Sequence, residues 1–135
     1  DIIFQNDDGS GGVETYFFLD GSSGGGNAQT IFPDNSYLLL GTGSDLELFH
    51  NGTNSYIDNN TGDLYIRQEA DGKDIVFKCD DGSGGSTTYI TLDGSNVSVN
   101  ILTQKVIMAN LPTSDPVVDG QLWNDSGTLK VSAGE

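Results

Sequence analysis

The sequence DIIFQNDDGSGGVETYFFLDGS at residues 1–22 recurs as DIVFKCDDGSGGSTTYITLDGS at residues 74–95. The two segments align without gaps, and 15 of their 22 positions are identical. Self-similarity of this kind is typical of proteins built by stacking copies of one supersecondary unit. The duplication therefore favours a repeat-built fold. Because there are only two copies, a gene duplication inside an ordinary β-domain is the alternative.

A shorter repeat lies between these two copies. NSYLLLGTGSDLELFHNGT, which begins at Asn35, resembles NSYIDNNTGDLYIRQEADG, which begins at Asn54, at an offset of about 19 residues. In the long repeat, the DDG of residues 7–9 returns at 80–82. Asp-Gly pairs supply a side-chain acceptor and a position with unrestricted φ, which are requirements of tight turns. We therefore interpret the repeated aspartates as turn formers first and as ligands only second.

Between the turns lie short segments rich in β-branched and aromatic residues, the pattern of strands joined by tight turns. We expect strands at residues 2–4, 15–19, 37–40, 46–49, 55–57, 64–66, 75–77, 87–92 and 97–101. Only residues 104–111, QKVIMANL, are expected to form a short helical turn. The sequence thus predicts an all-β fold, in which short strands and Asp-Gly turns build a β-solenoid or β-prism-like fibre.

The repeat-built part is expected to end near Leu111, which gives three regions. We expect residues 1–110 to form the fibre segment. Residues 111–120, LPTSDPVVDG, contain two of the three prolines and are expected to form an extended linker. Residues 121–135 follow, with a C-terminal β-hairpin in which Trp123 is the anchor.

Composition and charge limit the possible partners. Leu, Ile, Val and Phe make up 35 of 135 residues, and 19 residues are glycine, so a core formed by one chain is thin. Proteins with too small a core in one chain are usually stabilised by association between copies. The net charge of −15 and the single arginine, Arg67, oppose binding to nucleic acids and to anionic membranes. No run of about 18 apolar residues is present, so we also expect no membrane insertion.

No residue pattern typical of catalysis or cofactor binding is found. The sequence contains no Walker A segment and no dinucleotide-binding glycine triplet, and it has one histidine and one cysteine. Cys79 stands where the other repeat has Asn6, so the repeat does not require a thiol. We predict that the chain is not an enzyme and has no catalytic, cofactor-binding or metal-binding residues.

Residues 58–69 come nearest to a calcium loop. Asp58 and Glu69 occupy its first and twelfth positions, but Gly62 falls at the fifth position, whereas an EF-hand needs glycine at the sixth. We therefore exclude an EF-hand. His50 ends an alternating segment, and in a threefold assembly three copies of it could surround an ion. An exposed histidine beside a turn is the simpler interpretation.

Two segments resemble a known family. Residues 40–67, LGTGSDLELFHNGTNSYIDNNTGDLYIR, are similar to a motif of tail-fibre and related virion structural proteins of marine tailed phages, notably those of cyanobacteria and SAR11-type bacteria. Residues 111–134, LPTSDPVVDGQLWNDSGTLKVSAG, resemble the C-terminal ending of many such proteins. Together the two segments cover about 50 of the 135 residues.

The resemblance implies a segment of a tail fibre or virion appendage, extracellular when mature, that is usually an intertwined homotrimer and serves host attachment. Its implied partners are copies of itself, other virion proteins, and a glycan or protein of the host surface. The family has no defined catalytic residues. The alternative function is a carbohydrate-binding or depolymerase-like β domain, in which aromatic side chains stack on sugars. The candidates for that stacking are Tyr16, Tyr37, Tyr56, Tyr65 and Trp123.

Overall fold

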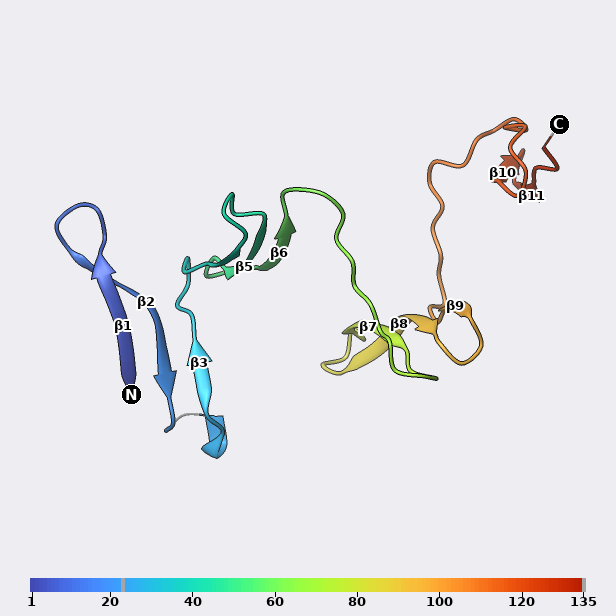
Figure 1. Cartoon of the computed structure of the whole chain (residues 1–135). Helices are drawn as coiled ribbons and strands as arrows, with labels where there is room; N and C mark the ends of the chain where they lie inside the picture. The colour runs from blue at the N-terminus through green and yellow to red at the C-terminus, as the bar shows by residue number, and fades with distance from the viewer. Residues whose placement is uncertain (23, 135) are drawn as a thin grey trace. The chain divides into compact units, whose positions relative to one another are not determined.

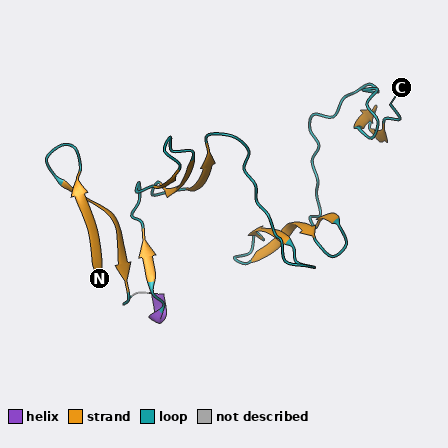
Figure 2. Cartoon of the chain, viewed as in Figure 1, coloured by secondary structure: helices purple, strands orange, loops and turns teal. Residues whose placement is uncertain are grey.

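Short antiparallel strands and tight turns make up the computed structural model, which describes residues 1–22 and 24–134 (Figure 1). Its contacts divide the chain into two units, Asp1–Ile66 and Arg67–Glu135. Within the described residues there is no α-helix, and one 3-10 turn occurs at Gly24–Gly26 (Figure 2). The prediction of an all-β fold is confirmed, and the sheets are small and open.

The first unit begins with a three-stranded sheet formed by the first copy of the long repeat. Its strands are β1 (Ile2–Asp7), β2 (Val13–Asp20) and β3 (Gln29–Ile31), in that order. β1 and β2 form a hairpin closed by the DDGSGG turn, and β3 adds to the other edge of β2. The third strand was not predicted from the sequence.

The second sheet of this unit contains the short repeat. Its strands are β4 (Leu38–Leu40), β5 (Leu46–His50) and β6 (Ser55–Asn59), with β5 in the centre. The two NSY segments of the repeat lead into the two outer strands. Tyr37 and Tyr56 therefore stack on opposite sides of Phe49, with ring centroids 4.2 and 4.7 Å from its own.

In the second unit, β7 (Ile75–Asp80), β8 (Ser86–Asp93) and β9 (Ser98–Ile101) repeat the architecture of β1–β3. The pairing register shifts after Phe4 in one sheet and after Phe77 in the other, which leaves Tyr16 and Tyr89 as the extra residues of two equivalent β-bulges. The structural repeat is thus longer than the sequence repeat. The two copies differ in the loop before the third strand, which has eight residues (21–28) in one and four (94–97) in the other.

The C-terminal hairpin is formed by β10 (Leu122–Asp125) and β11 (Thr128–Val131). Residues 111–120 contain no strand, but hydrogen bonds connect them to this hairpin. The Asn124 amide donates to the Pro112 carbonyl at 2.8 Å, and the Ser132 hydroxyl donates to Asp115 at 2.6 Å. The division into 1–110, 111–120 and 121–135 stays a prediction.

Two other expected elements are absent. Residues 104–111 form no helical turn, because eight uncapped residues are too few for a stable helix, which needs about 12 to 15 residues on its own. Residues 64–66 belong to no sheet, although their composition favours a strand. The segment before them turns towards β5: Asn60 donates its backbone N–H to the Asp45 carbonyl at 2.8 Å.

None of these sheets has a buried apolar core. Among the described residues no hydrophobic side chain is buried, and Ser132, with 1% of its surface exposed, is the one buried residue. The structure is therefore held by ladder hydrogen bonds, by contacts between neighbouring side chains on the sheets and by side-chain hydrogen bonds in the turns.

We predict that Gly82→Val destabilises the protein by more than about 1 kcal/mol, because Gly82 has φ +80° and a β-branched residue is strained there. An added Cβ at Gly82 meets no atom within 4 Å, so backbone strain is the only expected cause. Gly21→Val is the matched control, since Gly21 has equally open space and no positive φ. Equal losses for both variants in thermal melts would contradict the turn assignment.

Candidate functional site

The β1–β3 sheet has apolar side chains on both faces: Ile3, Phe18 and Ile31 lie on one face, and a larger set lies on the other. Side chains alternate across a strand, so the pairs Ile2↔Leu19 and Phe4↔Phe17 place four apolar residues on the same face. The Phe17 ring stacks on Phe4 at 4.3 Å and on Phe32 at 5.6 Å, which adds Phe32 to this face. Ile2 is 60% exposed, so nothing in the described part of the chain covers this end of the face.

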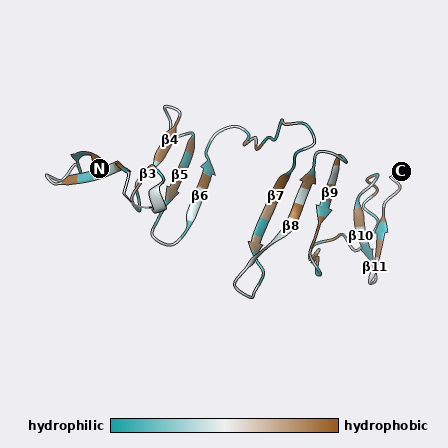
Figure 3. Cartoon of the chain, turned by 90° about the horizontal axis from the view of Figure 1, so that it is seen from below, coloured by the Kyte–Doolittle hydropathy of each residue, from teal (hydrophilic) through white to brown (hydrophobic). Residues whose placement is uncertain are grey.

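The two other three-stranded sheets have equivalent faces. By register, the β7–β9 sheet presents Ile75, Phe77, Ile90, Leu92, Val99 and Ile101 together. The β4–β6 sheet presents Leu38, Leu40, Leu46, Leu48 and Ile57. Hydrophobic residues lie along the strands of all three sheets (Figure 3). We call these three surfaces the apolar faces; contiguous exposed apolar surface of this kind marks an interaction site.

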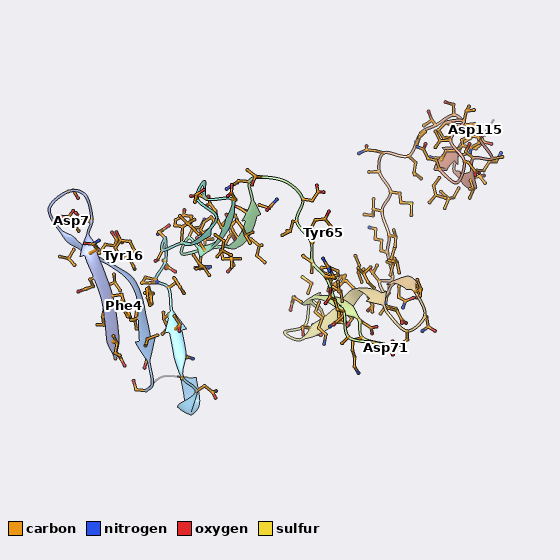
Figure 4. The ribbon with its side chains drawn as sticks, viewed as in Figure 1. Phe4, Asp7, Tyr16, Tyr65, Asp71 and Asp115 are labelled. Carbon is orange, nitrogen blue, oxygen red and sulfur yellow. The ribbon has the colours of Figure 1, made fainter. Side chains whose placement is uncertain are left out.

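A hollow lies between the β1–β2 hairpin and the start of the second sheet. Its volume is about 530 Å³, and Tyr16 and Tyr37 both line it. The remaining lining residues are Asp7, Asp8, Gly9, Glu14, Thr15, Asn35, Ser36 and Leu39. Ser36 connects the two sides, because its hydroxyl donates to the Tyr16 carbonyl. Asp7 and Tyr16 lie near the loop end of the hairpin (Figure 4).

The duplicated DDGSGG turns have the same hydrogen bonds. Asp8 Oδ1 accepts from the backbone amides of Ser10 and Gly12 at 2.8 and 2.9 Å and from the Ser10 hydroxyl. These bonds, the Ser10 amide first, hold the pKa of Asp8 below its ordinary value of 3.8. In the second copy the Ser83 hydroxyl is the largest cause of the lowered pKa of Asp81. Both carboxylates therefore stabilise a turn, as the sequence predicted.

The other aromatic candidates do not join the hollow. Tyr56 lies in β6, and its hydroxyl accepts from the side-chain amides of Asn51 and Asn54. Tyr65 lies between β6 and β7 and is 76% exposed. Trp123 lies in β10, with the Lys130 ammonium 5.2 Å from its ring centroid. The structure thus brings two of the five candidates, Tyr16 and Tyr37, to one place.

The candidate ion ligands lie apart. His50 lies on the edge of the β4–β6 apolar face, where its Nδ1 is 3.0 Å from the Ser55 hydroxyl. Asp58 lies in β6, whereas Glu69 forms an ion pair with Arg67 at 2.7 Å. In residues 1–22 and 24–134 no group of three or more His, Cys, Asp or Glu side chains is arranged to hold a metal ion.

Comparisons with protein-family models, with curated proteins and with solved structures found no match to this chain. A membrane-spanning helix is also absent from the described residues, since none of their helices is long and apolar enough.

Sequence reasoning missed two features of these surfaces. Phe32 follows a glycine-rich stretch and a three-residue strand, so no alternating pattern indicated that it continues the apolar face. The hollow was also missed, because it combines residues from two different sheets. The repeated Thr-Tyr pair at residues 15–16 and 88–89 was a usable signal for the bulge.

We predict that Asp81→Ala lowers the melting temperature and that Asp81→Asn lowers it less, because asparagine keeps an acceptor oxygen for Ser83 and Gly85.

The lowered pKa of Asp81 means that its stabilising contribution is present above the unfolded-state pKa and is lost as pH falls through the folded-state pKa. Between pH 5 and pH 3, Asp81→Asn should therefore lose less stability than the parent. A calcium site would instead make Asp81→Asn about as harmful as Asp81→Ala, and EDTA would then destabilise the parent.

Proposed function

We propose that this chain is a structural segment of a phage tail fibre or related virion appendage, that it assembles as a homotrimer, and that it serves host attachment. The observation that carries the proposal is the set of apolar faces, one on each three-stranded sheet, with no hydrophobic side chain buried among the described residues. The resemblance of residues 40–67 and 111–134 to virion structural proteins gives the assembly its biological setting.

The free energy of burying the exposed apolar side chains favours association over an isolated chain. Full burial of one Leu, Ile or Phe side chain contributes about 1.5–3 kcal/mol. Covering five half-exposed side chains therefore contributes on the order of 5 kcal/mol for each sheet. A whole domain is typically stable by only about 5–15 kcal/mol, so the apolar faces are large enough to decide whether the fold persists.

In the proposed fibre, the apolar faces of three chains pack together and the sheets form a β-prism or β-solenoid. The acidic turns then face water, where their charge keeps the assembly soluble. Its partners are copies of the same chain, other virion proteins, and a glycan or protein on the host surface. The segment is extracellular when mature and has no catalytic role.

We expect multi-angle light scattering to give about three times the chain mass of 14.3 kDa. Ile90→Glu should lower this mass towards that of one chain, because it places a charge in the middle of the β7–β9 apolar face. Its neighbour Thr91 points to the opposite face of β8, so Thr91→Glu is the matched control. A parent protein that is monomeric at micromolar concentration and unfolds cooperatively would refute the trimer.

The hollow beside Tyr16 favours a second candidate function, binding of a carbohydrate. Aromatic faces pack against the apolar faces of sugar rings, and carboxylates such as Asp7 and Glu14 accept hydrogen bonds from sugar hydroxyls. Tyr16 and Tyr37 are 48% and 44% exposed, so their surfaces are accessible to a ligand.

If this second function operates, the parent protein binds a subset of glycans on an array, and Tyr37→Ala weakens that binding at least tenfold. Tyr65→Ala is the control, since Tyr65 is exposed but lies outside the hollow. The absence of any glycan signal from the correctly folded parent, or equal effects of both variants, would remove carbohydrate binding at this hollow.

A further inference from the structure

Residues 64–66, Leu-Tyr-Ile, are a strand-like segment outside every sheet. These three residues are 47%, 76% and 62% exposed, respectively. In the short repeat they follow TGD (61–63) as β5 follows TGSD (42–45), with one residue fewer in the turn. Leu64, Tyr65 and Ile66 thus correspond to the first three residues of β5, the central strand of its sheet.

The two outer strands of the β4–β6 sheet, β4 and β6, each pair with a strand on one side only. On the β4 side, Ser36 hydrogen-bonds to Tyr16 of β2, and Leu39 lines the same hollow as Tyr16. β6 is the other outer strand, and it has a neighbour only on its β5 side. An exposed edge strand is a ready template for pairing with a further strand.

The hydrogen-bond pattern shows which groups of β6 point outward. The amide of Asn60 donates to Asp45 and that of Asn51 to Asn54, and in an antiparallel ladder hydrogen-bonded pairs alternate with non-bonded pairs. By this alternation, Tyr56 and Asp58 direct their backbone groups to β5. Ser55, Ile57 and Asn59 therefore direct theirs to the open edge.

The short repeat gives a register for that edge. β4 pairs with β5 through Leu38↔Leu48, Leu39↔Glu47 and Leu40↔Leu46. Transferred to the second copy, the same register gives Ile57↔Ile66, Asp58↔Tyr65 and Asn59↔Leu64. In this register, the backbone N–H and C=O groups of Ile66 and Leu64 face those that Ile57 and Asn59 direct to the open edge. It also places Leu64 and Ile66 on the apolar face that already contains Leu38, Leu48 and Ile57.

The chain directs residues 64–66 away from its own β6. After β6, Asn60 donates its side-chain amide to the Ser44 carbonyl at 2.8 Å and to Glu47 at 3.0 Å. Thr61 donates to Asp45 at 3.0 Å. These bonds hold the turn against the β5 side of the sheet, opposite to the open edge. Tyr65 lies on the segment that follows β6 (Figure 4).

We propose that residues 64–66 of one copy add as a fourth, antiparallel strand to the open edge of β6 in another copy, in the register Ile57↔Ile66. The occupant of the edge is a second copy of this chain, because the matching strand is present in the sequence but does not fold onto its own sheet. This strand addition rests on the proposed self-association and specifies one of its contacts. Donor and acceptor differ, so the contact is heterologous and can close a ring.

Disulfide trapping tests the register directly. Asp58 and Tyr65 form a non-hydrogen-bonded pair, whose Cα atoms lie about 4.5 Å apart, within reach of a disulfide. Asp58→Cys and Tyr65→Cys are each made in the full chain with Cys79→Ser, mixed, refolded together and oxidised. We expect a mixed disulfide dimer to be the main cross-linked species. Leu39→Cys with Tyr65→Cys is the matched control, since Leu39 holds the equivalent position in β4, and at least tenfold less dimer is expected.

The other outcomes overturn the proposal. A chain with both Asp58→Cys and Tyr65→Cys that closes its disulfide within a monomer would show that the segment pairs with its own β6. Equal yields from the Asp58 and Leu39 pairs would show no preference for this edge.

A variant without a new cysteine gives a second test. Ile66→Pro removes the N–H that faces Ile57 and should reduce the mass measured by light scattering; an unchanged mass counts against strand addition. If the parent is oligomeric and no cross-link forms, strand addition fails alone, whereas a monomeric parent refutes the proposed self-association as well.

Discussion

The structure depends on one constraint: each three-stranded sheet carries a set of exposed apolar side chains on one face, and nothing in the described chain buries that set. A three-stranded sheet is close to the smallest that is stable in water, and it needs its hydrophobic face covered. The strands, their register and their bulges arrange this face. Hydrogen bonds close the ladders and turns, but their net contribution is too small to replace burial of apolar surface.

The acidic turns complement this arrangement. In both copies of the long repeat, a carboxylate fixes the hairpin turn by accepting hydrogen bonds from the residues that follow it, as Asp8 does for Ser10 and Gly12. The geometry of this turn determines which residues of the two strands face each other. The same carboxylates supply negative charge at the ends of the hairpins. Turn geometry and surface charge therefore come from the same residues, while the apolar side chains lie on the sheet faces.

The sequence predicts the hairpins better than it predicts the contacts between separate sheets. The hairpins were predictable because their turn residues recur and their strands alternate. The strand Gln29–Ile31 was not, because three residues after a glycine-rich loop carry no periodic signal. Residues 64–66 show the opposite error, since composition favours a strand but a strand exists only with a partner. The hollow between Tyr16 and Tyr37 depends on contacts between separate sheets, which spacing along the chain does not reveal.

The unequal loops before β3 and β9 have a consequence for variation. One sheet architecture, including its bulge, accommodates either eight or four residues at this position, so the loop length is not fixed by the fold. Loops of this kind tolerate insertions because their backbone lies at the surface. New surface chemistry can therefore arise at this position while the strands stay in register. This loop is therefore the natural place to insert a peptide into an engineered variant of the chain.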